Sequence, residues 1–260
     1  AAQANLAVSK SVNYTASRNL VPASSTQVSN WADWRNVICF VADDGDQNEH
    51  LNTAERCAAI VQEANKNINL DKIYSDAFPQ KSNSGGQRYP AVTTAINDRM
   101  DRGSLFLTYV GHSGKDGWAH ERILEFSDIN NWHNTYNQPV IMTLSCDFAW
   151  YDRAMVSPAE ACFFNTNGGS MALITTSRVA YGGSNSTYAR KLFGRLFTTA
   201  GNNPRTMGEM NMLAKNDYGG NSDAISMFVL IGDPSMPLAV PKYKVVIDSV
   251  NGMPANALTD

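Results

Sequence analysis

The chain has 260 residues, of which 43% are hydrophobic and 17% charged, and this balance excludes an intrinsically disordered protein. Its formal net charge is −3 and its 21 Lys and Arg residues are scattered without a basic run, so we expect no nucleic acid partner. The sequence contains no run of the roughly 18 to 20 apolar residues that a membrane helix needs.

The N-terminal third begins with a stretch of small and polar residues. Residues 1–30 are rich in Ala, Ser, Asn and Thr, and we expect a peripheral segment without a regular element there. Residues 36–42 form a continuous apolar run, which is typical of a strand buried on both faces of a parallel sheet. This run ends in the acidic turn Asp43-Asp44-Gly45-Asp46. Asn52 and Glu55 form a capping box, which predicts that a helix begins at Asn52.

The remainder of the chain alternates between strand and helix patterns. We expect strands over residues 71–74, 105–110, 140–145, 170–176 and 227–231, with a loop over 78–86 and a further strand over 245–247. Helices are predicted over 90–102, 127–132 and 186–199, with others starting at Ser157 and at the capping box of Thr206 and Glu209. This alternation predicts an α/β fold with a mostly parallel sheet and helices on both faces.

Polar and reactive residues come directly after four of the predicted strands. In parallel α/β sheets the reactive groups gather at the carboxyl ends of the strands. The residues at such ends are Asp43 and Asp44, His112, Cys146, and Ser177 and Arg178. We therefore expect these residues, which are far apart in sequence, to lie at one edge of the sheet.

Cys146 is the candidate nucleophile. It stands where the chain leaves the predicted strand 140–145, and a thiolate beside a base can attack a carbonyl carbon. The alternative is a small buried side chain at a strand end. Cys39 lies within a strand, while Cys57 and Cys162 lie on helices, so we expect structural roles for these three. None of the four cysteines forms a C-x-x-C pair, and we predict neither a disulfide framework nor a zinc site from them.

His112 is the candidate base. The glycines at 111 and 114 let the backbone turn tightly around it, and a histidine there can act as general base and then as general acid. The backbone N–H groups of Ser113 and Cys146 would then stabilise the oxyanion. The alternative is a loop histidine that is only hydrogen-bonded.

The acidic turn offers a third participant. Asp43 or Asp44 would orient the imidazole of His112, as a third group does in catalytic triads. The alternatives are a solvated turn or a calcium-binding loop, since Asp43, Asp44, Asp46 and Asn48 supply oxygen ligands, although their spacing differs from that of an EF-hand. We expect no cofactor and no metal at the active site, and we leave a structural calcium ion open.

An ordered set of motifs resembles the gingipain family of cysteine peptidases. The motifs are Cys39 to Asp46, Gly111-His112-Ser113-Gly114 with Trp118, Cys146, and Ile231-Gly232-Asp233-Pro234-Ser235. The resemblance runs from about Trp34 to Pro241. Within the family the chain is most similar to the PorU-type C-terminal signal peptidases (sortases) of the bacterial type IX secretion system. Residues 33–37, 117–124 and 241–248 carry this closer similarity.

The resemblance implies a fold and a set of residue roles. The fold would be a caspase-like three-layer sandwich, with a catalytic domain over residues 31–241 and the start of a C-terminal β extension over 242–260. His112 and Cys146 would form the catalytic dyad, and Asp44 would hydrogen-bond the catalytic histidine. We expect the substrate-binding residues to be Trp118, Asp46, Ser177 and Arg178. The His112 motif departs from the family pattern, which usually reads Gly-His-Gly.

The resemblance also implies a function. The enzyme would remove the C-terminal sorting signal of exported cargo and transfer the acyl group to water or to a lipopolysaccharide amine. Its partners would be the protein substrate, an outer-membrane partner protein and the lipopolysaccharide acceptor, at the cell surface in association with the outer membrane. One alternative is a secreted gingipain-like endopeptidase, for which Asp46 would select a basic side chain. Another is a caspase-like scaffold in which Cys146 is inert.

Overall fold

A six-stranded sheet forms the centre of the molecule. The computed structural model describes residues 1–16, 18–219, 223–241, 247–251 and 253–254. The strand order is β13-β10-β9-β5-β1-β2, and all neighbours are parallel except β13, which runs antiparallel to β10. These strands are β1 (Val37–Ala42), β2 (Asn69–Tyr74), β5 (Phe106–Val110), β9 (Val140–Leu144), β10 (Ala172–Thr176) and β13 (Phe228–Ile231).

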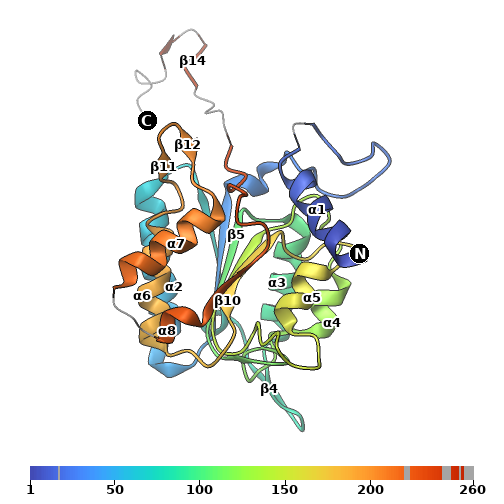
Figure 1. Cartoon of the computed structure of the whole chain (residues 1–260), viewed down its shortest axis with the longest axis vertical. Helices are drawn as coiled ribbons and strands as arrows, with labels where there is room; N and C mark the ends of the chain where they lie inside the picture. Colours follow the sequence, from blue (N-terminus) through green and yellow to red (C-terminus); the bar gives the residue numbers. More distant parts are fainter. Residues whose placement is uncertain (17, 220–222, 242–246, 252, 255–260) are drawn as a thin grey trace.

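Helices cover both faces of this sheet. They are α1 (Ala2–Tyr14), α2 (Glu49–Ala64), α3 (Pro90–Arg102), α4 (Phe126–Asn131), α5 (Pro158–Phe164), α6 (Gly182–Phe193), α7 (Met207–Tyr218) and α8 (Asp223–Ser226). Figure 1 shows α2, α6, α7 and α8 on one side of the sheet and α1, α3, α4 and α5 on the other. This arrangement confirms the predicted three-layer α/β fold. No described helix combines the length and apolar character needed to cross a membrane.

The loops outside the central sheet contain short strands of two or three residues. They form the hairpins β3 (Lys81–Asn83) with β4 (Gly86–Arg88), β11 (Thr199–Ala200) with β12 (Asn203–Pro204), and β14 (Ser249–Val250) with β15 (Met253–Pro254). A three-stranded unit consists of β6 (Ser113–Gly114), β7 (Gly117–Trp118) and β8 (Leu124–Glu125). This last unit comes soon after β5, so it carries the residues that succeed His112.

The sheet is buried on both faces because its central strands are apolar at nearly every position. In β1, Ile38 and Phe40 belong to the core on the α2 and α6 side, whereas Cys39 and Val41 belong to the core on the α3 side. Successive side chains of a strand point to opposite faces, so a continuous apolar run is what a doubly covered strand requires. The two cores fix the strands, and thereby the edge at which their carboxyl ends meet.

The N-terminal segment departs from the prediction, because residues 2–14 form helix α1. Its sequence carries no large apolar stripe, and its buried residues are Lys10 and Tyr14. The Lys10 amino group donates to the carbonyls of Gly168 and Ser170 at 2.8 and 3.0 Å. The Tyr14 hydroxyl accepts a hydrogen bond from the Ala239 N–H at 3.1 Å. A helix anchored by a lysine stem and one tyrosine leaves little apolar periodicity to detect.

Two predicted helix boundaries are also wrong. Helix α2 begins at Glu49 rather than Asn52, because the turn at Asp46–Asn48 leads directly into it. Helix α6 begins at Gly182 and ends at Phe193, so it is shifted toward the N-terminus relative to the predicted 186–199. Its first turn contains two glycines, which are poor helix formers and conceal the start. Leu196 is buried but packs from the turn after the helix.

Other predictions fall on loops and on the C-terminal segment. The predicted loop 78–86 contains β3 and the first residue of β4. The predicted strand at 245–247 has Val245 and Val246 outside the described residues, and Ile247 is not in a strand. The strands over 105–110, 140–145, 170–176 and 227–231 are confirmed, as are the helix over 90–102 and the capping box of Thr206 and Glu209.

Candidate active site

His112 and Cys146 lie just past the ends of adjacent strands in the same register. Val110, the last residue of β5, pairs with Leu144, the last residue of β9. His112 comes two residues after Val110, and Cys146 comes two residues after Leu144. The hydroxyl of Ser113 donates to the Cys146 carbonyl at 2.5 Å and joins the two loops directly. The sheet therefore brings the two predicted catalytic residues to one place.

The backbone of His112 is held at both of its polar groups. Its N–H donates to Asp43 Oδ2 at 2.9 Å, while its carbonyl accepts from the Tyr109 hydroxyl at 2.5 Å and from the Ala119 N–H at 2.8 Å. Gly111 makes this packing possible, because a Cβ there would lie 2.4 Å from both Asp43 Cβ and the Tyr109 hydroxyl. The loop that carries the imidazole is thus firmly positioned.

The imidazole of His112 is surrounded by polar rings and an acid. Its Nε2 lies 3.5 Å from Asp46 Oδ1, and the ring is 40% exposed. The ring of His50 meets it edge-on at 5.0 Å, and that of His120 stacks on it at 5.2 Å. Gly45 lies close beneath, since a Cβ there would be 3.1 Å from His112 Cδ2. The ring can therefore exchange protons with solvent or substrate while neighbours limit its orientation.

Cys146 differs from the other cysteines in its exposure. All four cysteines lie in the described part of the chain and are free thiols, and Cys146 alone is half-buried. Burial raises the pKa of Cys57 to about 12 and also raises the pKa values of Cys39 and Cys162. These three thiols therefore stay protonated at neutral pH and are poor nucleophiles. Structural roles for them and accessibility of Cys146 agree with the sequence analysis.

The thiol of Cys146 lies beside the start of α6. Its Sγ is 3.4 Å from both the N and the O of Ala180, and Tyr181 is the N-cap of the helix. The first turn of α6 carries no acidic side chain. The N-terminus of a helix carries a partial positive charge, which favours an anion nearby.

The Ser113 N–H is placed at the free edge of a small sheet. Ser113 pairs with Trp118, and the connecting hydrogen bond runs from the Ala119 N–H to the His112 carbonyl. In this antiparallel pattern Ser113 is a position without ladder hydrogen bonds, so its N–H points away from β7. That orientation suits the predicted oxyanion donor, and the roles of Ser113 and Cys146 in such a hole stay predictions.

The acidic turn contributes residues other than the expected one. Asp44 Oδ2 accepts a hydrogen bond from the Tyr89 hydroxyl at 2.6 Å, and within the described residues no hydrogen bond or ion pair joins Asp44 to His112. Asp43 instead holds the His112 backbone, and Asp46 faces its ring. The orienting role of Asp44 stays a prediction. In the turn that follows it, Asp46, Gln47 and Asn48 all have positive φ.

The four predicted substrate-binding residues lie in different environments. Trp118 is buried and stacks on Tyr109 with ring centroids 4.3 Å apart, and its role in substrate binding stays a prediction. Asp46 is 60% exposed next to His112. Ser177 is nearly buried and donates to the Met227 carbonyl at 3.3 Å, while Arg178 pairs with Asp152 at 2.5 Å. Of these four residues, Asp46 has an exposed side chain beside the His112 ring.

Several residues at the site were missed by the sequence analysis. His50 and His120 contact the His112 ring, and the spacing of four residues between Asp46 and His50 was a signal for the first of them. Val179 and Tyr181 flank Ala180 and are 53% and 72% exposed. Nothing in the local sequence places these two residues near Cys146, because the contact arises between β9 and the segment after β10.

A cavity opens next to His112. Its volume is about 610 Å³, and its lining runs from His112 to Ala119 and continues through His120, Arg122, Leu124 and Glu125. Cys146 does not line it.

The acidic side chains that could bind a calcium ion lie in two places. Carboxylate oxygens of Asp43, Asp44 and Glu121 lie within 4.8 Å of one another, whereas the Asp46 carboxylate faces His50 and His112. The predicted calcium ion is untested by this arrangement.

The comparisons with known proteins agree with this geometry. A model of peptidase family C25 matches residues 1–239. No curated protein matches the sequence. The crystal structure of the Arg-specific cysteine proteinase gingipain R (RgpB) is similar, with a TM-score of 0.68 and 15% identity over 90% of this chain and 52% of that one.

Two further solved structures give the same result. The complex of Porphyromonas gingivalis RgpB pro- and mature domains has a TM-score of 0.66 and 15% identity, covering 90% of this chain and 53% of that one. A structure described as a protease has a TM-score of 0.66 and 12% identity, covering 91% and 53%. The chain thus spans about half the length of these structures. Their similarity confirms the gingipain-like, caspase-like fold.

Proposed function

The chain belongs to peptidase family C25, a family of cysteine peptidases, and on this premise we propose that it cleaves peptide bonds with Cys146 as nucleophile and His112 as base. The observation that carries the proposal is the accessible Cys146 thiol, joined through its carbonyl to the loop of His112. A nucleophile and a base at adjacent strand ends are the minimum that acyl transfer requires.

The reaction has two halves. His112 takes the Cys146 proton, the sulfur bonds to the scissile carbonyl carbon, and the carbonyl electrons move onto oxygen. When the C–N bond breaks, His112 returns the proton to the leaving amine and a thioester remains. Water or an amine then attacks the thioester carbon, the C–S bond breaks, and the thiol is restored. The N–H groups of Ser113 and Cys146 would stabilise the oxyanion in both halves.

Two features of the site support this chemistry. The Cys146 Sγ lies 3.4 Å from the Ala180 nitrogen, beside the N-terminus of α6, and the partial positive charge of a helix N-terminus attracts anions. The hydrogen bonds to both backbone groups of His112 keep the imidazole in place, and positioning is a large part of enzymatic rate enhancement. Asp46, rather than Asp44, is the acid whose contact with the ring supports an orienting role.

The first test removes the nucleophile. Cys146→Ala should lower kcat by on the order of 10⁴-fold or more, because losing one member of a nucleophile–base pair removes the mechanism. The matched control is Cys57→Ala, a buried cysteine on α2, which should retain activity once its folding is verified. In the unmodified protein, iodoacetamide at near-neutral pH should label Cys146 faster than the three buried thiols. Full activity of Cys146→Ala contradicts the mechanism.

We further propose that the substrate is the C-terminal sorting signal of type IX secretion cargo, and that the thioester passes to water or to a lipopolysaccharide amine. The support is the similarity of residues 33–37, 117–124 and 241–248 to PorU-type signal peptidases. The enzyme would then act at the cell surface, associated with the outer membrane and with a partner protein there. Protein substrate and lipopolysaccharide would be its two reactants.

A second candidate is a gingipain-like endopeptidase that cuts after basic residues. The exposed carboxylate of Asp46 beside His112 favours it, because such an acid pairs with Arg or Lys. A third candidate, a non-catalytic scaffold, gives no reason for a single accessible thiol beside a helix N-terminus.

One assay separates these candidates. A fusion protein carrying a type IX signal is incubated with the enzyme, with and without a small primary amine, beside Arg and Lys amide substrates. Cleavage before the signal, with the amine attached to part of the product, is expected for the signal peptidase. Rapid cleavage of the amides with an intact fusion protein indicates the endopeptidase instead. No turnover of either substrate, together with slow labelling of Cys146, would indicate the scaffold.

A further inference from the structure

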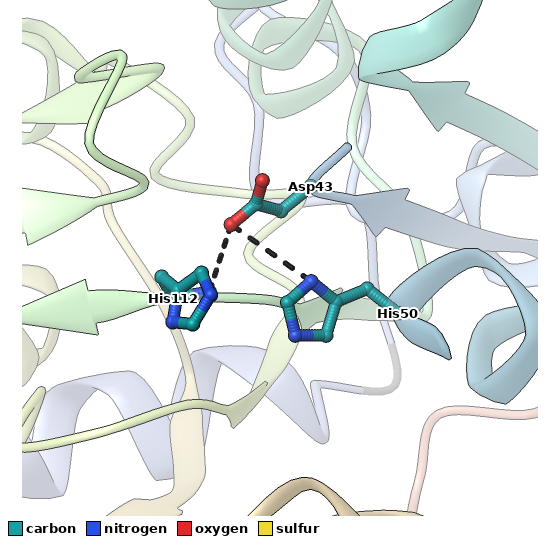
Figure 2. A group of neighbouring side chains, drawn as sticks. All are labelled: Asp43, His50 and His112. Atoms are coloured by element: carbon teal, nitrogen blue, oxygen red, sulfur yellow. Dashed lines mark hydrogen bonds and ion pairs between the residues drawn. The ribbon is translucent and has the colours of Figure 1, made fainter. Parts of the chain in front are cut away.

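Three side chains surround one small space next to the proposed catalytic centre. Figure 2 shows the imidazoles of His50 and His112 on the same side of the Asp43 carboxylate. One oxygen of Asp43 and one ring nitrogen of each histidine all lie within 4.8 Å of one another. The three residues come from the end of β1, from α2 and from the loop after β5, so tertiary structure alone assembles the cluster.

His50 is the unexplained member of this cluster. Its side chain is 9% exposed, and its Nδ1 is buried without a hydrogen-bond partner in the described structure. This nitrogen faces Asp43 Oδ2 at 3.9 Å, which is beyond hydrogen-bonding distance. A buried polar atom without a partner is costly and calls for an explanation, such as an ion that it binds.

We infer that Asp43, His50 and His112 form a binding site for a zinc-like divalent cation, and that the bound cation inhibits the peptidase. The binding part stands on the geometry of the three side chains alone. The inhibitory part rests on the proposed function, since it requires that His112 act as the base.

The geometry and the ligand types fit zinc. Zinc binds imidazole nitrogen and carboxylate oxygen at about 2.0–2.2 Å in a tetrahedron, which separates neighbouring ligands by roughly 3.3 Å. The gap of 3.9 Å between Asp43 and His50 needs to close only slightly. Water would supply the remaining position.

Asp46 would support the bound cation from outside. Its Oδ2 lies 3.4 Å from His50 Nε2, the ring nitrogen opposite the unpartnered Nδ1. A histidine that binds a metal through one nitrogen commonly donates its other N–H to a carboxylate, which fixes the ring. Asp43 is fixed as well, because Oδ1 accepts from the Gly45 N–H and Oδ2 from the His112 N–H. The site is therefore largely preorganised.

Cation binding would remove the base. A neutral imidazole has one nitrogen with a free lone pair, and the other carries a proton. When the cation occupies that lone pair on His112, the ring can no longer accept the proton of Cys146. Inhibition would thus follow without any contact between the cation and the thiol.

The test starts from Cys146→Ala, which removes the competing thiolate. Titration calorimetry with ZnCl₂ should show one bound Zn²⁺, and a tenfold excess of Ca²⁺ should not displace it. His50→Ala and His112→Ala in this background should each weaken binding at least tenfold. His133→Ala is the matched control and should bind like the parent, because this ring is exposed and its hydrogen bond in the described part of the chain is to the Asn131 carbonyl.

The outcomes separate the two parts of the inference. No zinc binding to Cys146→Ala, or binding that survives either the His50 or the His112 substitution, overturns the site. Since His112 is partly exposed, its variant remains informative if His50→Ala does not fold. In the enzyme with Cys146 intact, inhibition by zinc is measured for each variant against its own rate without zinc. The zinc concentration that halves this rate should be at least tenfold higher for His50→Ala than for the wild type. Zinc binding without inhibition overturns only the regulatory part, and an inactive wild type bears on the proposed function alone.

Discussion

At the scale of single residues, the hydrogen bond from the Tyr109 hydroxyl to the His112 carbonyl helps to set the position of His112. Tyr109 is buried, and its ring stacks on Trp118, so the hydroxyl is held where it can donate to the His112 carbonyl. Trp118 therefore acts through packing, as a support for the tyrosine that positions the loop. The indole therefore matters for the position of the His112 loop.

Tyr109→Phe should separate positioning from stability. The variant keeps the ring and loses one hydrogen bond, so the free energy of unfolding should fall by about 1 kcal/mol. The kcat/KM should fall roughly tenfold, because the imidazole loses part of its positioning. Tyr188→Phe is the matched control, since Tyr188 is equally buried and donates to Asn211 at 2.5 Å. It should lose similar stability and keep its activity, and equal activity losses in both variants would argue against positioning.

At the scale of elements, the N-terminal end of helix α6 lies beside Cys146, the proposed nucleophile. Two glycines, Gly182 and Gly183, begin this helix and lower its stability. Because they have no side chains, they add no bulk near Ala180 and Cys146. Apart from Gly183, its chain neighbours and the backbone of its own helix, no described atom lies within 4 Å of a Cβ built on Gly183. A charge can therefore be introduced at this helix end without a clash.

Gly183→Asp should weaken the effect of the helix on Cys146. An acid in the first turn interacts with the helix dipole by roughly 0.3–1 kcal/mol and would oppose the thiolate by a similar amount. The iodoacetamide labelling rate at neutral pH should therefore fall roughly twofold to fivefold. Gly183→Asn has nearly the same shape without the charge and should label like the wild type. A slower rate in Gly183→Asn as well would point to a steric cause.

At the scale of the whole molecule, α1 ties the N-terminus to the α5 side of the sheet through a buried lysine. Lys10 donates to the carbonyls of Gly168 and Ser170, and its amino group lies 5.5 Å from the ring centre of Phe163. Burial lowers the pKa of Lys10 from 10.5 to about 7, with a small opposing effect from Cys162. A neutral amine can still donate to both carbonyls.

This burial predicts a dependence of stability on pH. Between about pH 7 and 10.5 the unfolded chain keeps the Lys10 proton and the folded chain releases it, so the free energy of unfolding rises with pH there. From pH 7 to 8.5 the contribution is on the order of 1–2 kcal/mol. Urea unfolding at both pH values should show this increase in the wild type relative to Lys10→Met. The variant would be less stable overall, because two carbonyls lose their donor, and identical pH profiles would contradict the prediction.

Sequence alone determined the sheet and the position of the two candidate catalytic residues at its edge. Uninterrupted apolar runs can be satisfied only by strands buried on both faces, and parallel strands place their carboxyl ends at one edge. His112 and Cys146 were therefore recognisable from their positions just past the ends of such runs. The capping box of Thr206 and Glu209 was equally readable, because it is a local interaction over three residues.

Only the tertiary structure decided which groups surround the reactive pair. Asp43, Asp44 and Asp46 lie within four consecutive residues, yet their carboxylates have different partners. The burial of Trp118, the approach of His50 from α2 and the contact of Ala180 with Cys146 all join distant segments. Local patterns determine elements because their causes are local, whereas the surroundings of His112 depend on contacts between segments whose approach no local pattern encodes.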